Sequence, residues 1–444
     1  MEIRQFEDKG LSHYSYAVYS EKAGAVILID PARDVTPYVE FAAARNAKIT
    51  GVIETHPHAD FVSSHLELHQ ATGATIYCSA LVGAAYPHTA FDEGHTIQTG
   101  ELTFKALNTP GHSPDSISIV LEEKGVVKAV FTGDTLFIGD CGRPDLREKA
   151  GNLTATRADL AKQMYHSLRE KLMTLPDNTQ VYPAHGAGTL CGKSLSEANH
   201  STIGAEKLTN WSLQDYTEDA FVAELLSQQP YIPKYFPYDV DINRKGAPAL
   251  ATALEEVPVV TTGAALKGDV LLVDTRPAAA FKQSHLPHAI NLQLNGKFET
   301  WLGSVVTPGE AFYLIAADVA QLKEALRRAA SIGYESMIRG GTVYSGGSET
   351  MDPVPLDQLR AHPEQFTIID VRMDSETKAG ALLPGSMAIP LDQLRERIHE
   401  IPLGKPIVVH CAGGYRSAAG SSIVADALKE KTPVYDLGED IKTF

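Results

Sequence analysis

The chain has 444 residues, of which 43% are hydrophobic and 21% charged, and its formal net charge at pH 7 is −16. This length predicts roughly two to four domains, and the negative charge argues against non-specific binding to nucleic acid. No apolar run approaches the roughly 18 residues of a membrane-spanning helix, and the charged first residues lack the apolar stretch of a signal peptide. We therefore expect a cytoplasmic protein that binds neither nucleic acid nor membrane.

The first part of the chain, to about residue 210, alternates short apolar strands with turns and a few helices. Strands are predicted at 14–19, 25–30, 51–54, 75–78, 102–108, 116–121, 127–133 and 180–183, and helices at 37–45, 64–72 and 157–175. This mixture indicates a layered α/β sandwich. A short helix at 219–228 leads into a tyrosine- and proline-rich segment, 229–238, which we expect to be an ordered linker because aromatic side chains prefer burial.

An internal repeat occupies the rest of the chain. The sequence Leu-Val-Asp274-Thr-Arg276 recurs as Ile-Ile-Asp370-Val-Arg372, and a Leu-Pro pair follows each copy. The offset of about 96 residues leaves room for one small α/β domain per copy. We therefore predict three domains, at residues 1–250, 251–350 and 351–444.

The most informative run of the first domain is Thr-His-Pro-His-Ala-Asp-Phe at 55–61, directly after a predicted strand. Its two histidines, His56 and His58, and Asp60 form a compact donor set for a transition metal. A histidine at position 61 would complete a known type of site with six ligands and two metal ions. The chain has Phe61 there instead, so the metal chemistry has to be argued from the other donors.

Three later strand ends carry further donors: His112 in Thr-Pro-Gly-His-Ser, Asp134 in Phe-Thr-Gly-Asp-Thr and His185 in Tyr-Pro-Ala-His-Gly. Glycine and proline end each strand, which places the polar residue at the mouth of the sheet. A lone histidine is most often a hydrogen-bonded core or surface residue. Four such motifs in one domain favour a metal centre.

In this order the motifs resemble those of the metallo-β-lactamase superfamily, over residues 1–210. Within it, Gly-Asp-Cys-Gly-Arg-Pro-Asp-Leu at 139–146 and Ser-Thr-Ile-Gly-Ala-Glu-Lys at 201–207 are similar to the persulfide dioxygenase branch. The resemblance implies an αββα sandwich and one Fe(II) per chain. The ligands that it implies are His56, His112 and Asp134, with supporting roles for His58, Asp60 and His185.

The residue types agree with this resemblance. Two neutral imidazoles and one carboxylate, with open coordination positions, suit a non-haem Fe(II) oxygenase, and Phe61 removes an imidazole from any second site. Zinc accepts the same ligands.

Other polar residues near these motifs are candidates for substrate binding. Arg143 has five donors for the carboxylate or phosphate of a thiol carrier, with a structural ion pair to Asp145 as the alternative. Cys191 is either a buried apolar residue or a thiol that faces the substrate, and the same choice holds for Cys141.

The second strong signal is the loop His-Cys-Ala-Gly-Gly-Tyr-Arg at 410–416, between an apolar strand and a predicted helix. Loop amides around the sulfur and the N-terminus of the helix favour the thiolate, which is the nucleophile. Cys411 and Arg416 are the predicted catalytic residues. The loop residues predicted to bind substrate are Gly413, Gly414 and Tyr415.

With Asp370 and Arg372 upstream, this loop resembles a rhodanese domain over residues 352–444. The first copy, 252–345, has the same pattern but carries Ala-Ala-Asp at 316–318 where the loop should be. We interpret it as an inactive rhodanese-like domain that serves as spacer and interface.

The leading hypothesis is a bifunctional enzyme of sulfide detoxification. Its first domain would oxidise a low-molecular-weight thiol persulfide with O2 to sulfite, and a Cys411 persulfide would transfer sulfur to give thiosulfate and thiol. A zinc thioesterase resembling glyoxalase II, with an accessory sulfurtransferase domain, is the alternative, and a non-catalytic persulfide-sensing module is a third reading. The thiol carrier, whether glutathione, coenzyme A or bacillithiol, stays open, and a homo-oligomer, dimer or tetramer, is expected.

Overall fold

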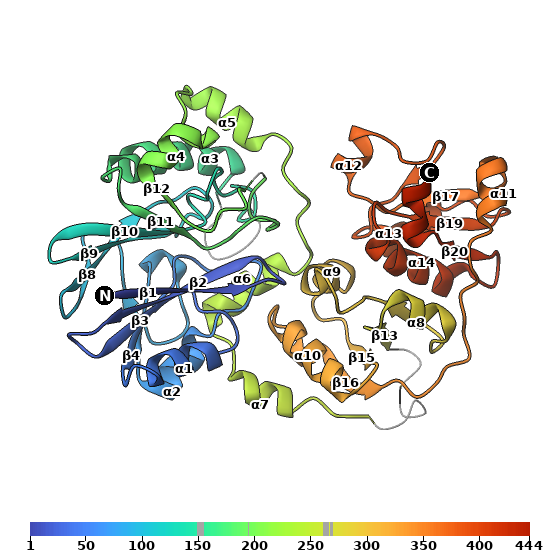
Figure 1. Cartoon of the computed structure of the whole chain (residues 1–444), viewed down its shortest axis with the longest axis horizontal. Helices are drawn as coiled ribbons and strands as arrows, with labels where there is room; N and C mark the ends of the chain where they lie inside the picture. Colours follow the sequence, from blue (N-terminus) through green and yellow to red (C-terminus); the bar gives the residue numbers. More distant parts are fainter. Residues whose placement is uncertain (149–154, 194, 261–265, 267–269) are drawn as a thin grey trace. The chain divides into compact units, whose positions relative to one another are not determined.

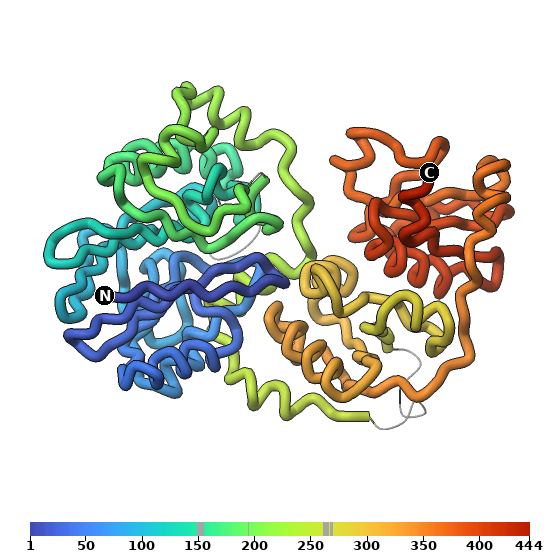
Figure 2. The backbone as a smooth tube through the Cα atoms, viewed as in Figure 1, coloured from blue at the N-terminus to red at the C-terminus, as the bar shows by residue number. Residues whose placement is uncertain are grey.

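The computed structural model describes residues 1–148, 155–193, 195–260, 266 and 270–444. The chain divides into two units: Met1–Thr252 with Ser331–Gly333, and Ala253–Ala330 with Tyr334–Phe444. Figures 1 and 2 colour the first unit from blue to green and most of the second from yellow to red. Within the described residues, no helix is both long and apolar enough to cross a membrane.

Two six-stranded sheets form the first unit, in the orders β1-β2-β3-β4-β5-β6 and β12-β11-β10-β9-β8-β7. The strands β1 to β6 are Glu2–Asp8, His13–Ser20, Ala25–Ile29, Lys48–Ile53, Thr75–Cys78 and Thr89–Ala90. The strands β7 to β12 are Thr96–Thr99, Leu102–Asn108, Ile117–Glu123, Val126–Gly133, Gln180–Pro183 and Ser201–Thr202.

The inner faces of the two sheets enclose one apolar core, in which Tyr16 and Ile27 of the first sheet and Phe104 and Phe131 of the second are buried. Helices cover both outer faces (Figure 1). On the first sheet these are α1, Thr36–Ala43, and α2, His65–Thr72; on the second they are α3, Arg157–His166, α4, Ile203–Thr209, and α5, Glu218–Leu226. The layers are those of the predicted αββα sandwich.

Some elements differ from the sequence-based prediction. The helix predicted at 157–175 is α3 followed by a π turn, Ser167–Lys171, and a 3-10 turn, Leu172–Thr174. The segment predicted as a linker buries Tyr235, but it then enters a helix, α6, Phe236–Lys245. Proline in the first turn of α6 suits a helix start, and this signal was missed.

The second unit contains two parallel sheets with equivalent strand orders, β14-β13-β15-β16 and β18-β17-β19-β20. The strands β13 to β16 are Leu271–Asp274, Ala289–Asn291, Phe312–Ala316 and Ile338–Val343, and β17 to β20 are Thr367–Asp370, Met387–Ala388, Ile407–His410 and Val434–Asp436. The helices α7 to α10 are Leu250–Glu255, Ala278–Gln283, Phe298–Val305 and Val319–Ala330, and α11 to α14 are Leu356–Ala361, Asp374–Ala379, Leu394–Arg397 and Tyr415–Leu428.

The internal repeat is visible in the side chains as well as in the topology. Arg276 Nη2 lies 2.6 Å from Asp274 Oδ2, and Arg372 Nη2 lies 2.6 Å from Asp370 Oδ2. Each arginine reaches back over the end of the first strand of its sheet. The two copies are therefore duplicated folds with the same internal ion pair.

Candidate metal centre and sulfur-transfer loop

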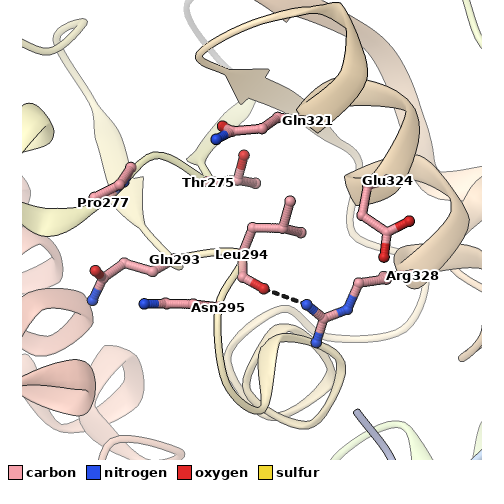
Figure 3. A pocket seen from close by; sticks show the side chains of 8 residues that line it. All are labelled: Thr275, Pro277, Gln293, Leu294, Asn295, Gln321, Glu324 and Arg328. Carbon is pink, nitrogen blue, oxygen red and sulfur yellow. Dashed lines mark hydrogen bonds between the residues drawn. The ribbon is translucent and has the colours of Figure 1, made fainter. Parts of the chain in front are cut away.

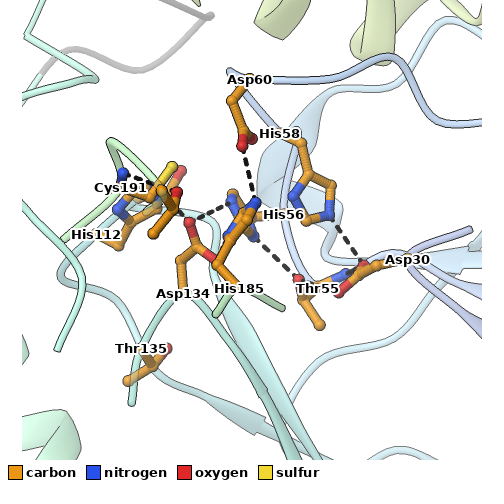
Figure 4. A network of polar contacts seen from close by, with 12 residues as sticks. Asp30, Thr55, His56, His58, Asp60, His112, Asp134, Thr135, His185 and Cys191 are labelled. Carbon is orange, nitrogen blue, oxygen red and sulfur yellow. Dashed lines mark hydrogen bonds and ion pairs between the residues drawn. The ribbon is translucent and has the colours of Figure 1, made fainter. Parts of the chain in front are cut away.

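The three predicted metal ligands come together at one edge of the sandwich (Figure 4). His56 follows β4 of the first sheet, whereas His112 lies between β8 and β9 and Asp134 follows β10, all in the second sheet. Asp134 Oδ2 lies 3.9 Å from His56 Nε2 and 3.5 Å from His112 Nε2. One donor atom from each residue lies within 4.8 Å of the others, and all three side chains are buried. The two sheets thus share one set of donors.

Hydrogen bonds determine which ring nitrogen each histidine presents. The Thr55 hydroxyl donates to Asp30 Oδ2 at 2.8 Å, so it accepts the proton of His56 Nδ1 at 3.0 Å. His112 Nδ1 donates to the carbonyl of Arg143 at 2.9 Å. In both rings the lone pair is therefore on Nε2, the nitrogen that faces Asp134.

The charge states suit a cation. Burial lowers the pKa of His56 well below its ordinary value and also lowers the pKa of His112, so both rings are neutral at pH 7. Burial opposes the charge on Asp134, but His185 and His112 outweigh it and hold the pKa of this carboxyl well below its usual range.

Two of the facing atoms, His56 Nε2 and Asp134 Oδ2, are buried without a hydrogen-bond partner among the described residues. An unpartnered buried polar atom is costly, and a cation between these atoms would satisfy both. The three residues therefore fit a metal ion.

His185 forms ion pairs with Asp134 and Asp60 and does not belong to the donor set of His56, His112 and Asp134. Its Nδ1 lies 2.8 Å from Asp134 Oδ1 and its Nε2 lies 2.8 Å from Asp60 Oδ2 (Figure 4). Burial disfavours the charged ring, but Asp134 and Asp60 outweigh this effect and raise the pKa of His185 to about 10. An imidazolium donates from both nitrogens and has no lone pair. This geometry suits a residue that orients Asp134.

Phe61 is 1% exposed and contacts two imidazole rings. Its ring centre is 3.7 Å from that of His13 and 4.3 Å from that of His58. Burial lowers the pKa of His13 well below its ordinary value, so its ring beside Phe61 is neutral. His13 was not predicted, because a single histidine at the start of a strand carries no motif.

A second layer of polar residues surrounds the metal ligands. His58 Nε2 lies 3.1 Å from Asp30 Oδ1, and the same oxygen accepts the backbone N–H of Thr55 at 2.7 Å. Burial, followed by the charge of Asp30, raises the pKa of Glu54 well above its ordinary value. Asp30 and Glu54 were not predicted. Each is the last residue of a predicted strand, and Glu54 directly precedes the His56 motif. This position at a strand end is the signal that could have identified them.

Cys141 and Cys191, the two cysteines considered as candidates, have different surroundings. Cys191 is buried, and its sulfur lies within 4.8 Å of donor atoms of Asp60 and His185. Cys141 is packed in the apolar core beneath α3. Burial raises the pKa of both thiols well above the ordinary value. For Cys141, the structure therefore supports the buried apolar residue rather than a thiol that faces the substrate. Cys191 instead lies next to Asp60 and His185, close to the candidate metal ligands.

The prediction that Arg143 binds a substrate needs correction. Its Nε and Nη2 bind Asp145 at 2.7 and 2.8 Å. Its other N–H groups donate to the carbonyls of Leu190, Tyr231 and Pro230. All five donors of this buried side chain are used within the protein. The alternative, a structural ion pair with Asp145, describes its role.

Gly142 shows why the loop at 139–146 passes so close to the metal ligands. A Cβ atom at this position would lie 1.9 Å from the Asp134 carbonyl oxygen and 3.1 Å from His112 Cβ. Only glycine leaves room for this approach.

In the second unit, Cys411 lies in the turn between β19 and α14. Its sulfur accepts the N–H of Gly414 at 3.2 Å. Gly414 has φ +96°, a left-handed conformation that glycine adopts without strain. The helix α14 begins at Tyr415, so its N-terminal end follows the cysteine directly. This is the cradle expected of a reactive thiolate.

Arg416 is anchored beside this turn. Its Nη2 lies 2.8 Å from Glu376 Oε1, and this contact lowers the pKa of Glu376. In the first copy, β15 ends at Ala316 and α10 begins at Val319, so only two residues stand where the cysteine loop would be.

Known proteins show the same division of the chain. The Metallo-beta-lactamase superfamily model matches residues 8–185, and the Rhodanese-like domain model matches residues 263–349 and 355–443. "Persulfide dioxygenase ETHE1, mitochondrial" of Bos taurus is 30% identical over 198 residues, which are 44% of this chain and 72% of that protein. The chain belongs to the persulfide dioxygenase family of the metallo-β-lactamase superfamily.

This member of the persulfide dioxygenase family carries two rhodanese-like domains behind its metal domain, as the sequence predicted. A crystal structure of a metallo-beta-lactamase from Staphylococcus aureus subsp. aureus COL has a TM-score of 0.68 and 32% identity, and the match covers 77% of this chain and 98% of that one. The predictions of an αββα domain followed by two rhodanese-like domains, and of an enzyme of dioxygenase and sulfurtransferase type, are confirmed.

Another branch of the superfamily is also similar. The hydroxyacylglutathione hydrolase of Methylococcus capsulatus is 34% identical over 175 residues, which are 39% of this chain and 62% of that protein.

Proposed function

We propose that the first domain of this persulfide dioxygenase family member binds one Fe(II) and catalyses the oxidation of a low-molecular-weight persulfide: R–S–SH + O2 + H2O → R–SH + SO3²⁻ + 2H⁺. The observation that supports it most is the donor set, two neutral imidazoles and one carboxylate at one sheet edge, with His185 bonded to the second oxygen of that carboxylate.

Iron bound by His56, His112 and Asp134 would supply the one-electron chemistry that O2 needs to react with a sulfur. The chain's own residues prepare the site. Thr55 and the Arg143 carbonyl hold the two rings with Nε2 inward, and His185 engages Asp134 Oδ1 so that Oδ2 stays available. Burial keeps both rings neutral and so preserves their lone pairs.

We further propose that Cys411 transfers the sulfane sulfur. In the first step the Cys411 thiolate attacks the outer sulfur of a persulfide: a new S–S bond forms to Sγ, the R–S–S bond breaks, and the thiol R–SH leaves with the proton. In the second step sulfite attacks the outer sulfur of the Cys411 persulfide and gives thiosulfate, with the thiolate restored. The buried sulfur beside the Gly414 amide and the start of α14 supports this assignment.

Substitution of Cys411 tests the division of labour between the domains. We expect Cys411→Ser to abolish thiosulfate:acceptor transfer, because serine is a far weaker nucleophile, and to leave O2 uptake on a persulfide unchanged. Cys78→Ser, at a buried cysteine of the other unit, is the matched control and should retain transfer. Loss of both activities in Cys411→Ser would contradict the proposal.

A zinc-dependent thioesterase is the second candidate, because the hydroxyacylglutathione hydrolases are similar to the first domain. Two features argue against it. Phe61 stands where a histidine would complete a second metal site, and both ring nitrogens of His185 contact carboxylates, those of Asp134 and Asp60. Zinc-loaded protein should therefore fail to hydrolyse S-lactoylglutathione.

A further inference from the structure

The inactive rhodanese-like domain contacts the cysteine loop of the active one. The phenol of Tyr415, which follows that loop, donates to the carbonyl of Gln293 at 2.7 Å. A Cβ atom on Gly296 would lie 3.6 Å from the Tyr415 ring. Burial raises the pKa of Tyr415 above its ordinary value, so the phenol keeps its proton and can donate.

The segment that receives this bond is held from within the inactive domain by Arg328 of α10. Its Nη1 donates to the Leu294 carbonyl (Figure 3). Its Nη2 donates to the Gly296 carbonyl at 2.9 Å. The charge of Arg328 is paired with Glu299 of α9. The guanidinium therefore holds the backbone at Leu294 and Gly296, directly after Gln293 in the chain.

The same segment borders a cavity of about 330 Å³, lined also by Thr275 and Gln321 (Figure 3). Backbone beside an open cavity lacks close-packed neighbours on that side. Its position therefore depends on directional bonds, and Arg328 supplies two of them.

Further contacts join the two rhodanese-like domains around α14. The backbone N–H of Asn291 donates to the Ser422 hydroxyl at 2.8 Å. The guanidinium carbon of Arg416 lies 5.8 Å from the ring centre of Trp301. The Tyr415 contact is thus part of a continuous interface that ends at the cysteine loop.

We propose that Tyr415 is a positioning residue for sulfur transfer and that the inactive domain, through Arg328 and the Gln293 carbonyl, sets the conformation of the Cys411 loop. The inference rests on the proposed role of Cys411. The amide that contacts the Cys411 sulfur belongs to Gly414, the residue before Tyr415. A shift of Tyr415 therefore moves a group that touches the nucleophile.

The test is the steady-state kinetics of thiosulfate-to-cyanide transfer by the full chain. Tyr415→Phe keeps the ring and removes the donor, and we expect kcat to fall about tenfold with KM for thiosulfate changed less than about twofold. Arg328→Lys should lower kcat in the same way, since lysine cannot hold two carbonyls with a planar fork.

Both substitutions act through the same chain of contacts to the Cys411 loop. The kcat of the double variant should therefore stay within about twofold of the kcat of Tyr415→Phe. Tyr344→Phe, which loses a phenol bonded to Ser284 within the inactive domain, is the control and should retain wild-type kcat.

Wild-type kcat in Tyr415→Phe, an equal loss in Tyr344→Phe, or multiplicative losses in the double variant would each overturn the inference. If Tyr415→Phe fails to fold, the kcat of Arg328→Lys is the test, and a wild-type value in that variant overturns the inference. Absence of transfer in the wild-type chain would instead overturn the proposed function of Cys411, and this inference with it.

Discussion

At the scale of single residues, the candidate metal centre depends on which atoms are left without partners. Thr55 and a backbone carbonyl use the Nδ1 protons of His56 and His112, and His185 uses one oxygen of Asp134. What remains is one lone pair from each ring and one carboxylate oxygen. Phe61 adds no donor to this set, so these three residues form a site for one ion.

Asp134→Asn should lower the iron content of purified protein at least about tenfold, because a neutral amide is a much weaker ligand than a carboxylate and leaves His185 without its partner. Elemental analysis measures the effect. Asp92→Asn, which changes a carboxylate bonded to Ser79 in the same unit, is the matched control and should keep its metal. Full iron occupancy in Asp134→Asn would contradict the assignment.

Cys141 gives a prediction about stability. Cys141→Ser places a hydroxyl in the apolar core beneath α3, and we expect the free energy of unfolding to fall by about 1–3 kcal/mol. Both activities should persist, since the thiol lies away from the metal ligands. Urea denaturation measures the loss, and an unchanged stability with lost O2 uptake would show that this thiol takes part in the chemistry.

At the scale of elements, the strand ends were predictable because each carries glycine or proline followed by a polar residue. The strands missed, such as β1 and β7, alternate charged or polar residues with few apolar ones and lie at sheet edges. The strand-end pattern pointed to the candidate donors, and the resemblance to the persulfide dioxygenase branch selected His56, His112 and Asp134 among them. The prediction that Arg143 binds substrate failed because its partners Leu190, Pro230 and Tyr231 are distant in the chain. Only the fold brings them together.

The contact between α3 and α5 gives a prediction about pH. His166 lies at the end of α3, and bonds to Glu170 and then Glu218 raise its pKa above the ordinary 6.5. A raised pKa means that the stabilisation is fully present below pH 6.5 and is lost as the pH rises through the higher folded value. His166→Gln should therefore cost about 0.5 kcal/mol at pH 5.5, because the pair is exposed and screened.

The same variant should lose less stability at pH 9 than at pH 5.5, because the stabilisation fades as the pH rises through the raised pKa of His166. His200→Gln is the control, since the His200 ring is bonded to Asn199 rather than to a carboxylate, and should have little effect at either pH. Thermal unfolding at pH 5.5 and pH 9 measures the stability of both variants. An equal loss of stability in His166→Gln at the two pH values would exclude the ion pair as the cause of that loss.

At the scale of the whole molecule, the donors come from both sheets of the sandwich, His56 from the first and Asp134 from the second. A metal bound there ties the two sheets together. A ligand that binds only the folded state stabilises it, by about 2.7 kcal/mol at one hundred times the dissociation constant. A chelator should therefore lower the Tm of the wild-type first unit and leave the Tm of Asp134→Asn unchanged. An equal shift in both would show that the chelator acts elsewhere.

The central claim, one iron that works on persulfide sulfur, is tested most directly by metal analysis of protein purified without added metal, combined with O2 uptake after a persulfide is added. We expect about one iron per chain and close to one O2 consumed per sulfite formed. Two zinc ions per chain, no O2 uptake and hydrolysis of S-lactoylglutathione would contradict the proposed function.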